Sequence, residues 1–129
     1  MSLTYNLKFK IKIGEKQELQ KLIKNHDNKI FIISNILTPK FNFIESSFGS
    51  DYINLELKNA SYISFDIIKK DMDCVLLRKS VLQLVHAITN EIYPEEDYFF
   101  DFNGDYIHEK RENGIVKRNS NSDFYEGLD

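Results

Sequence analysis

The stretch DYFFDFNGDYIHEKRENGIVKRN, residues 97–119, contains Asn-Gly twice, ten residues apart. Asn-Gly between alternating segments is the strongest short-range signal for a β-hairpin, because a type I′ turn needs positive φ at both central residues. Two such turns predict a three-stranded meander. In the register that they impose, Phe100 faces Ile107, and Glu109 lies opposite Arg118 as a cross-strand charge pair.

The two faces of this meander differ in character. The face expected to pack on the core carries Tyr98, Phe100, Phe102, Ile107 and Val116. The other face carries Asp97, Phe99, Asp101, Tyr106, His108 and Lys110. A strand face that mixes aromatic and acidic groups is either covered by a loop or tail, or serves in protein recognition. The candidate partner-binding residues are therefore Phe99, Asp101, Tyr106 and His108, with the acidic run Glu95, Glu96 and Asp97.

Carboxylates around the first Asn-Gly pair also raise two metal-binding hypotheses. DFNGD resembles part of an EF-hand, but Phe99 and Lys110 stand where that motif needs its first acid and its final glutamate. The second hypothesis is a divalent-ion site for phosphodiester hydrolysis, built from Asp97, Asp101, Asp105 and His108. The predicted register turns Asp105 away from the other three, and acidic residues are ordinary in turns.

Alternation also predicts the first strand. Apolar residues occupy every second position from Leu7 to Ile13, and the lysines between them, including Lys8, form a row that we expect to be solvated. The run 30–33 is apolar at every position, which is typical of a central strand buried on both faces. Pro39 predicts a loop after it.

The middle of the chain predicts a short strand at 41–44, a turn at SSFGS (46–50) and then a hairpin. KNAS, residues 58–61, joins the two segments of that hairpin. Its inward side chains are Ile53, Leu55, Leu57, Ile63, Phe65 and Ile67.

Helical spacing of apolar residues predicts two helices. A short amphipathic helix covers 15–26, and a long helix begins at a cap formed by Asp71 or Asp73 and stops at Pro94. The buried stripe of the long helix is Leu77, Val81, Leu84, Val85, Ile88 and Ile92. His86 falls on the opposite side of that helix.

Strands with one polar face, joined by short turns, predict an α+β protein. We expect a mainly antiparallel sheet with two helices packed on one face and the meander at its C-terminal end. A length of 129 residues fits a single domain, 1–129. The tail 120–129 is polar, which favours partial disorder, although Phe124 and Tyr125 could dock onto the domain.

Composition excludes several classes of partner. The net charge is −3, and a broad phosphate-binding surface needs a basic face, so no nucleic-acid partner is expected. No segment is apolar for long enough to cross a bilayer, and the N-terminus lacks the uninterrupted apolar block of a signal peptide. The single cysteine, Cys74, excludes an internal disulfide, so we expect a cytoplasmic protein.

The residues predict no catalytic site, cofactor or metal. His26, His86 and His108 lack the spacing of a metal-ligand motif. Cys74 stands at a helix start beside apolar residues, with no histidine near it in sequence, and is expected to be a small core residue. The five glycines form no phosphate-binding loop.

The part from Tyr52 to Tyr125 resembles the bacterial immunity proteins that accompany swarming-inhibition (Sit-type) toxins, a branch of the polymorphic toxin systems. The matching segments are Tyr62-Ile63-Ser64-Phe65-Asp66, Val81-Leu82-Gln83-Leu84, Asp97-Tyr98-Phe99-Phe100-Asp101-Phe102-Asn103-Gly104 and Asp123-Phe124-Tyr125. The chain departs from the family at Tyr125, where Trp is common, and at Asp66, where a basic residue is expected. The resemblance implies a protein that binds a toxin and carries no catalytic residues.

The leading hypothesis is thus a cytoplasmic immunity protein that binds a cognate toxin domain and blocks it sterically and electrostatically. A small metal-dependent hydrolase using Asp97, Asp101 and His108 is one alternative. A general adaptor domain of a larger assembly is another. The sequence leaves the identity of the toxin and the oligomeric state open.

Overall fold

The computed structural model describes residues 3–40, 46–48, 51–53, 60–69, 71–103 and 106–128. Its strands are β1 (Thr4–Phe9), β2 (Phe31–Lys40), β3 (Ser46–Phe48), β4 (Asp51–Ile53), β5 (Ala60–Ile67), β6 (Tyr98–Phe102), β7 (Tyr106–Glu112) and β8 (Ile115–Arg118). Its helices are α1 (Gln17–Lys24) and α2 (Cys74–His86), which continues into the π-helix η1 (Ala87–Ile92).

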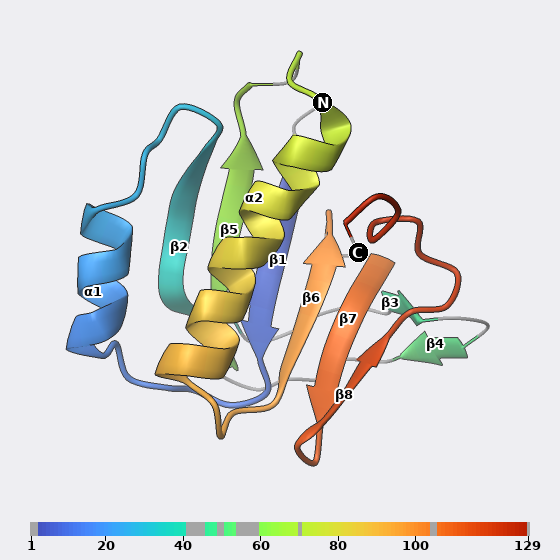
Figure 1. Cartoon of the computed structure of the whole chain (residues 1–129). Coiled ribbons are helices and arrows are strands. Elements are labelled where there is room, and N and C mark those ends of the chain that lie inside the picture. Colours follow the sequence, from blue (N-terminus) through green and yellow to red (C-terminus); the bar gives the residue numbers. More distant parts are fainter. Residues whose placement is uncertain are drawn as a thin grey trace.

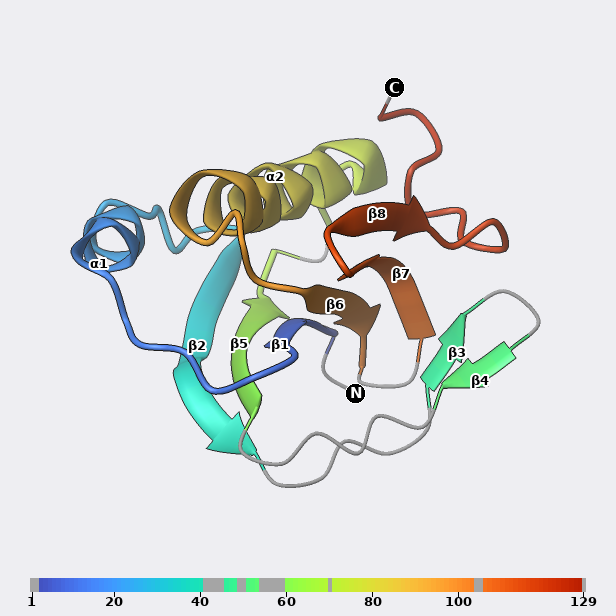
Figure 2. The ribbon, with the colours of Figure 1, turned by 90° about the horizontal axis from the view of Figure 1, so that it is seen from below.

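In the described residues the strands form one sheet in the order β2-β5-β1-β6-β7-β3-β4, and β8 also pairs with β7. The strand pairs are antiparallel apart from a parallel bridge between Ser47 and Tyr106. Both helices lie on the same side of this curved sheet (Figures 1 and 2). The predicted α+β class is confirmed, with its mainly antiparallel sheet, two helices on one face and the C-terminal meander β6-β7-β8.

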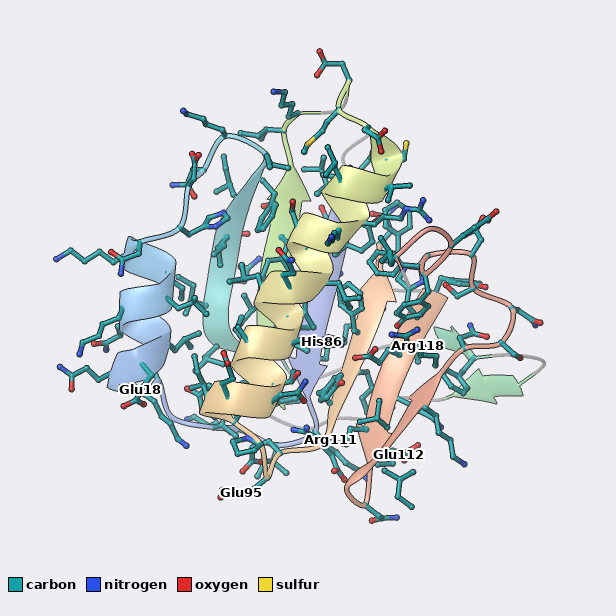
Figure 3. The ribbon with its side chains drawn as sticks, in the orientation of Figure 1. Glu18, His86, Glu95, Arg111, Glu112 and Arg118 are labelled. Carbon is teal, nitrogen blue, oxygen red and sulfur yellow. The ribbon has the colours of Figure 1, made fainter. Side chains whose placement is uncertain are left out.

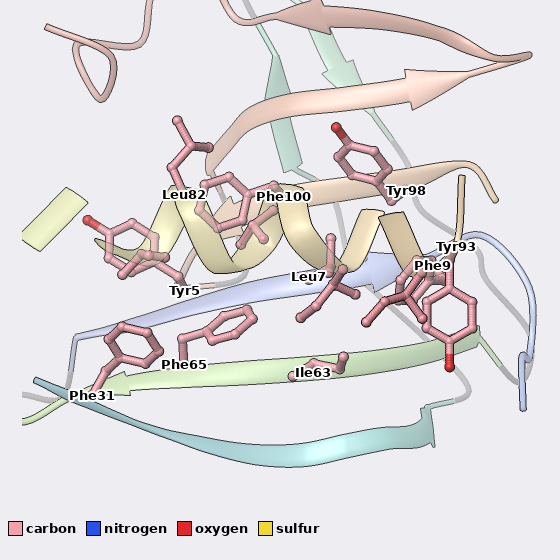
Figure 4. Close-up of a cluster of buried hydrophobic side chains, with 14 of the residues drawn as sticks. Tyr5, Leu7, Phe9, Phe31, Ile63, Phe65, Leu82, Tyr93, Tyr98 and Phe100 are labelled. Carbon is pink, nitrogen blue, oxygen red and sulfur yellow. The ribbon is translucent and has the colours of Figure 1, made fainter. Parts of the chain in front are cut away.

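The core lies between the sheet and α2 (Figure 4). Strands β1 and β5 supply alternate apolar side chains that are fully buried, including Leu7, Phe9, Ile63 and Phe65. The predicted stripe of the long helix is confirmed: Val81, Val85, Ile88 and Ile92 are buried, and Leu77 and Leu84 pack beside them. Burying each such side chain stabilises the fold by about 1.5–3 kcal/mol.

The long helix begins where one of the two predicted caps places it. The Asp73 carboxylate accepts hydrogen bonds from the backbone N–H groups of Val75 (2.8 Å) and Leu76 (3.2 Å), so Asp73 is the cap and Asp71 is not. The helix ends at Ile92, just before Pro94, as predicted. No helix in the described part of the chain is long and apolar enough to span a bilayer.

The C-terminal tail packs on the domain. Phe124 and Tyr125 are buried, which confirms their predicted docking. The Phe124 ring stacks on His108 at 4.6 Å between centroids, and Arg78 donates from Nη1 to the carbonyls of Asp123 (2.8 Å) and Phe124 (3.0 Å). Residues 120–128 are thus fixed by contacts with both α2 and β7.

Two predictions for β1 are wrong. The strand ends at Phe9 and does not reach Ile13, and Ile11 is 55% exposed. The lysine row is not uniformly solvated, because Lys8 is buried and its Nζ lies 2.7 Å from the Asp101 carboxylate. The cause is that β6 pairs with β1 and brings an acid next to Lys8, which alternation within one strand cannot reveal.

The prediction for 30–33 as a central, doubly buried strand is also wrong. β2 is an outer strand of the sheet, and Ile32 on its open face is 44% exposed. Pro39 is not in a loop either, since β2 continues through it opposite Ser61. The pairing with β5 is interrupted by a bulge in which Asn35 and Leu37 have φ of 52° and 53°.

The hairpin prediction around KNAS is not supported in the described residues. β5 pairs with β1 and β2, whereas β4 pairs with β3, so residues 46–48 of SSFGS form a strand where a turn was predicted. Ala60 and Ser61 of KNAS already belong to β5. The inward side chains Ile63, Phe65 and Ile67 are buried as predicted. The predicted strand at 41–44 and residues 54–59 lie outside the described residues.

The meander has the predicted register in its second hairpin only. β7 and β8 pair with Glu109 opposite Arg118, and Asn113 and Gly114 have φ of 53° and 78°, as a type I′ turn requires. In the first hairpin, Phe100 faces Glu109 and not Ile107, which is a shift of two positions. One position is lost at the turn, where Phe102 pairs with Tyr106, and the other at a bulge between Phe100 and Asp101. Sequence signals for a turn set the local geometry but do not reveal a bulge three residues away.

Candidate interaction surface

The bulge in β7 separates the candidate partner-binding residues of the meander. Phe99 packs with Ala60 and Ile107 on the side of the sheet away from α2. His108 packs on the α2 side, within 5.7 Å of the Phe100 ring and 4.6 Å of the Phe124 ring. The prediction that Phe99, Asp101, Tyr106 and His108 share one open face is therefore wrong. Three of them are buried: Phe99, Asp101 and His108.

The acidic run lies elsewhere, in the loop between η1 and β6 at the lower end of the sheet (Figure 3). Asp97 has a structural role, because its carboxylate accepts hydrogen bonds from the backbone N–H groups of Asn113 (2.8 Å) and Gly114 (3.2 Å). Glu95 is exposed and Glu96 is half-buried, and neither carboxylate has a hydrogen bond or ion pair with any described side chain. These two charges face solvent.

Two adjoining hollows share Glu95 and Glu96. The larger, about 480 Å³, is formed by the loop 11–16 together with Tyr93 and the two glutamates. The smaller, about 330 Å³, runs from Lys10 and Ile11 past the same glutamates to the turn at Asn113 and Gly114. Exposed Ile11 belongs to both. The result is a concave surface lined by apolar side chains, among them Ile11 and Ile13, and by both kinds of charge. Its acids are Glu15, Glu95, Glu96 and Asp97, and its lysines are Lys10, Lys12 and Lys16.

Tyr93 fixes the loop that forms the larger hollow. Its hydroxyl donates to the Gly14 carbonyl (2.8 Å) and accepts from the Lys16 backbone N–H (2.9 Å). Lys16 in turn donates from Nζ to the Ile92 carbonyl (2.9 Å) and lies 5.0 Å from the Tyr93 ring centroid. Burial raises the pKa of the Tyr93 phenol, so the hydroxyl keeps the proton that it donates.

Arg111 fixes the loop that carries the two glutamates. Its guanidinium donates to the carbonyls of Thr89 (3.0 Å), Tyr93 (2.8 Å) and Glu96. These are carbonyls at and after the end of η1, which a helix leaves without internal partners. The guanidinium also lies 4.9 Å from the Tyr98 ring centroid. Sequence analysis missed Tyr93 and Arg111, because their partners are distant in the chain.

The most unusual titratable group is Glu109, a buried carboxylate beneath α2. It accepts hydrogen bonds from the hydroxyls of Tyr98 (2.6 Å) and Tyr125 (3.0 Å), and His86 Nε2 lies 3.0 Å from it. Burial alone would raise the pKa of Glu109, but these hydrogen bonds and the charge of His86 outweigh burial and lower it. Burial and the adjacent carboxylate raise the pKa of both tyrosines.

The position of His86 differs from the one predicted for it on the long helix. The residue does not point away from the domain; its ring turns toward β7 and contacts Glu109, with a side chain 33% exposed (Figure 3). The Glu109 cluster holds α2, β6, β7 and the tail together through one carboxylate. Since its members bond one another in the interior, the cluster stabilises the fold and offers no open site for a substrate.

Three residues of the metal hypothesis, Asp97, Asp101 and His108, are not brought together, and Asp105 lies outside the described residues. Asp97 binds the turn at residues 113–114, Asp101 pairs with Lys8, and His108 Nδ1 lies 2.7 Å from Ser122 Oγ. In the residues that the structure describes, no group of three His, Cys, Asp or Glu side chains is close enough to hold a metal ion. Burial lowers the pKa of His108 to about 4, so this ring is neutral at pH 7.

Cys74 corrects a further expectation. It is free and exposed at the first turn of α2, so it is not a core residue. The stripe of buried residues in α2 begins one turn later, and the first turn projects beyond the sheet (Figure 1).

A chain of side-chain hydrogen bonds crosses the other face of the sheet. Asn35 donates to Ser64, Ser64 donates to Asn6, and Asn6 donates to Asp101, with distances of 3.1, 2.9 and 3.0 Å. Asp66 accepts from Thr4 and Ser34, each at 2.9 Å. These polar groups bond one another across four strands, which stabilises the pairing of β2, β5, β1 and β6.

Comparison with protein-family models, with characterised proteins and with solved structures finds no match to this chain.

Proposed function

We propose that this protein is a cytoplasmic immunity protein that binds a cognate bacterial toxin domain and blocks it by steric and electrostatic contact. The observation that carries the proposal is the pair of hollows around Glu95 and Glu96, where apolar side chains lie among charged groups. Interfaces combine an apolar centre with a polar rim in this way. The resemblance of residues 52–125 to immunity proteins supports the same class.

The rigidity of this surface supports a binding role. Tyr93 and Arg111 fix the two loops that form it, through bonds to backbone carbonyls and N–H groups. A surface that is ordered before the partner arrives loses less conformational entropy on binding. The toxin would present a partly apolar projection to the hollows, with a cation placed at Glu95 and Glu96.

Three other acids of the described residues have structural roles, unlike Glu95 and Glu96. Asp101 pairs with Lys8, Glu109 bonds to two tyrosines and His86, and Asp97 holds a turn. These groups maintain the fold. Glu95 and Glu96 have no such task, so their replacement changes binding and leaves the fold intact.

The test is co-expression with the candidate toxin domain encoded by the adjacent reading frame. We expect growth rescue and co-purification with the native chain. In the double variant Glu95→Lys/Glu96→Lys, affinity should fall about tenfold at low salt and less at high salt, because exposed charges are screened. Glu18→Lys is a control for reversal of one surface charge, since Glu18 is exposed on α1 and lines neither hollow (Figure 3).

Failure of the native chain to rescue growth and to co-purify would contradict the proposed function. Equal affinity of the double variant and the Glu18 control would contradict the assigned surface. Circular dichroism of both variants establishes that the fold is kept.

A further inference from the structure

β8 has a regular outer edge. Among the described strands, β7 alone pairs with it, and the pairing is uninterrupted from Glu112–Ile115 to Glu109–Arg118. In a hairpin with a two-residue turn, the residue pair next to the turn, here Glu112 and Ile115, exchanges backbone hydrogen bonds. Along an antiparallel ladder, hydrogen-bonded pairs alternate with pairs that are not hydrogen-bonded, and Arg111 and Val116 form the next pair. The backbone N–H and C=O of Val116 therefore point away from β7. They can bond to an added strand.

The side chains of β8 are half apolar and half basic. All four are exposed, and Ile115 and Val116 are 61% and 49% exposed. β8 contains two cations, Lys117 and Arg118, and no acid. An exposed strand at a sheet edge can pair with an extended segment of another chain, and its side chains then select the partner.

The charge of Lys117 has no opposite charge beside it among the described side chains. Lys117 lies opposite Lys110 on β7. The Lys110 amine is 2.7 Å from Glu112 and 4.6 Å from the Phe48 ring centroid, so Glu112 pairs with Lys110 and not with Lys117. Lys117 forms no ion pair with any side chain in the described ranges. The position directly outside Lys117 thus favours an acid.

We propose that β8 binds an extended segment of a partner protein as an added antiparallel strand, with an acidic residue opposite Lys117 and apolar residues on either side. Backbone bonds to Val116 would fix its register. A second copy of this chain is a poorer occupant, because symmetric pairing of two β8 strands about Lys117 places two like charges opposite each other.

This site goes beyond the proposed function. The turn at Asn113 and Gly114 lines the smaller hollow and leads into β8, but none of the four β8 residues lines either hollow. A partner could use both, but each is tested without the other.

The test uses the full chain and three synthetic peptides, followed by NMR of the backbone amides. The first peptide is Ac-Thr-Val-Glu-Val-Thr-NH₂. The second replaces its Glu by Lys, and the third carries N-methyl groups on both valines, which lie opposite Val116 and Arg118 in the proposed register. We expect saturable shifts at β8 with the first peptide and about fivefold weaker binding of the second, since a charge pair across strands contributes up to about 1 kcal/mol. The third should not bind, because its bonding N–H groups are gone.

Protein variants provide the complementary test. Lys117→Glu should reverse the preference, so that the lysine peptide binds more tightly than the glutamate peptide. Val116→Pro should abolish binding of the glutamate peptide while keeping the fold, because this N–H points outward and proline is tolerated there in an edge strand. Lys29→Glu is the matched control, since it changes the net charge equally beside β2 and should leave peptide binding unchanged.

Several outcomes would overturn the proposal. They are the absence of saturable binding of the glutamate peptide, equal binding of all three peptides, or shifts confined to residues outside β7 and β8. Dimerisation of the peptide-free protein that Lys117→Glu changes would overturn the chosen occupant.

Discussion

β2 and β8 are both outer strands of the sheet, and they end it in different ways. β2 is long but irregular: a bulge with positive φ at Asn35 and Leu37 interrupts it, and Pro39 lacks a backbone N–H. β8 is short and regular, with all four side chains exposed. Natural sheets protect their edges with bulges and prolines. Short strands and lysines are further protections. β2 has a bulge and a proline, whereas β8 has neither and is protected only by its shortness and by Lys117.

The regions beneath these two edges also differ. Phe31 of β2 packs against Phe65 (5.8 Å between centroids) and His26 (4.5 Å), so apolar contact holds that side. Under β7 and β8, buried polar groups take this role, above all Glu109 and Arg111. The difference teaches that an edge strand such as β8 can keep its own side chains exposed, provided that buried charged groups hold the neighbouring strand, β7, in place.

A substitution on the β2 side of the sheet, which apolar contacts hold together, should give the largest loss of stability. Phe31→Ala is expected to lower the free energy of unfolding by about 3–5 kcal/mol, because it removes a buried ring and leaves a cavity. Ile32→Ala, its exposed neighbour on the other face, should change it by less than about 0.5 kcal/mol. Urea denaturation measures both. Equal effects would refute the assignment of the buried face of β2.

The stability contributed by the buried polar groups beneath β7 and β8 should depend on pH. Glu109→Gln is expected to cost about 2–3 kcal/mol at pH 7, because hydrogen bonds to a buried charge are lost. The lowered pKa of Glu109 contributes stability that is present above the ordinary glutamate value of about 4.3 and lost as pH falls through the folded value. The difference in stability between this variant and the native protein should therefore shrink in acid. Glu112→Gln is the control on the same strand, where the carboxylate is half-exposed and pairs with Lys110, with an expected effect below about 1 kcal/mol.

His108 supplies a second pH dependence with its own window. Its folded pKa of about 4 lies below its ordinary value of 6.5, so the unfolded chain binds a proton first as pH falls from 6.5 to 4. This costs about 2 kcal/mol of stability at pH 5 relative to pH 7. His108→Phe keeps a ring against Phe124 and should remove that loss in a pH series of thermal unfolding. Ser122→Ala, which removes only the hydroxyl partner, should keep it.

A substitution in the turn that leads into β8 should have the smallest effect on the free energy of unfolding. Gly114→Ala is expected to cost about 1 kcal/mol, because φ of 78° strains any residue with a Cβ. The added methyl group meets nothing within 4 Å, so the cost is conformational. Gly14→Ala adds a methyl group to equally open space without positive φ and should be neutral or slightly stabilising. Equal costs would contradict the type I′ turn.

Local signals predicted the parts of the fold that they determine. The stripe of α2, its cap at Asp73 and the turn at 113–114 depend on residues a few positions apart. Whether β2 lies at the edge or in the centre of the sheet is a different kind of property, because it depends on which strands pair with β2. The β7 bulge was hidden for the same reason: His108 and Glu109 turn to the α2 side to meet Phe124, His86 and Tyr98.

The candidate surface was predictable in part. Three consecutive acids after a proline predicted an acidic run at the surface, and Glu95 and Glu96 do face solvent. The hollows beside them were not predictable, since the loop 11–16 and Tyr93 come from distant parts of the sequence. Sequence also could not reveal that Asp97 is bound to a backbone turn.

β1 precedes the other described strands in the sequence, yet it lies between β5 and β6. Residues 98–102 are translated after β1, so the side of β1 that faces β6 has no partner until they are made. An apolar strand that waits for its neighbour in this way is exposed to chaperones and to self-association.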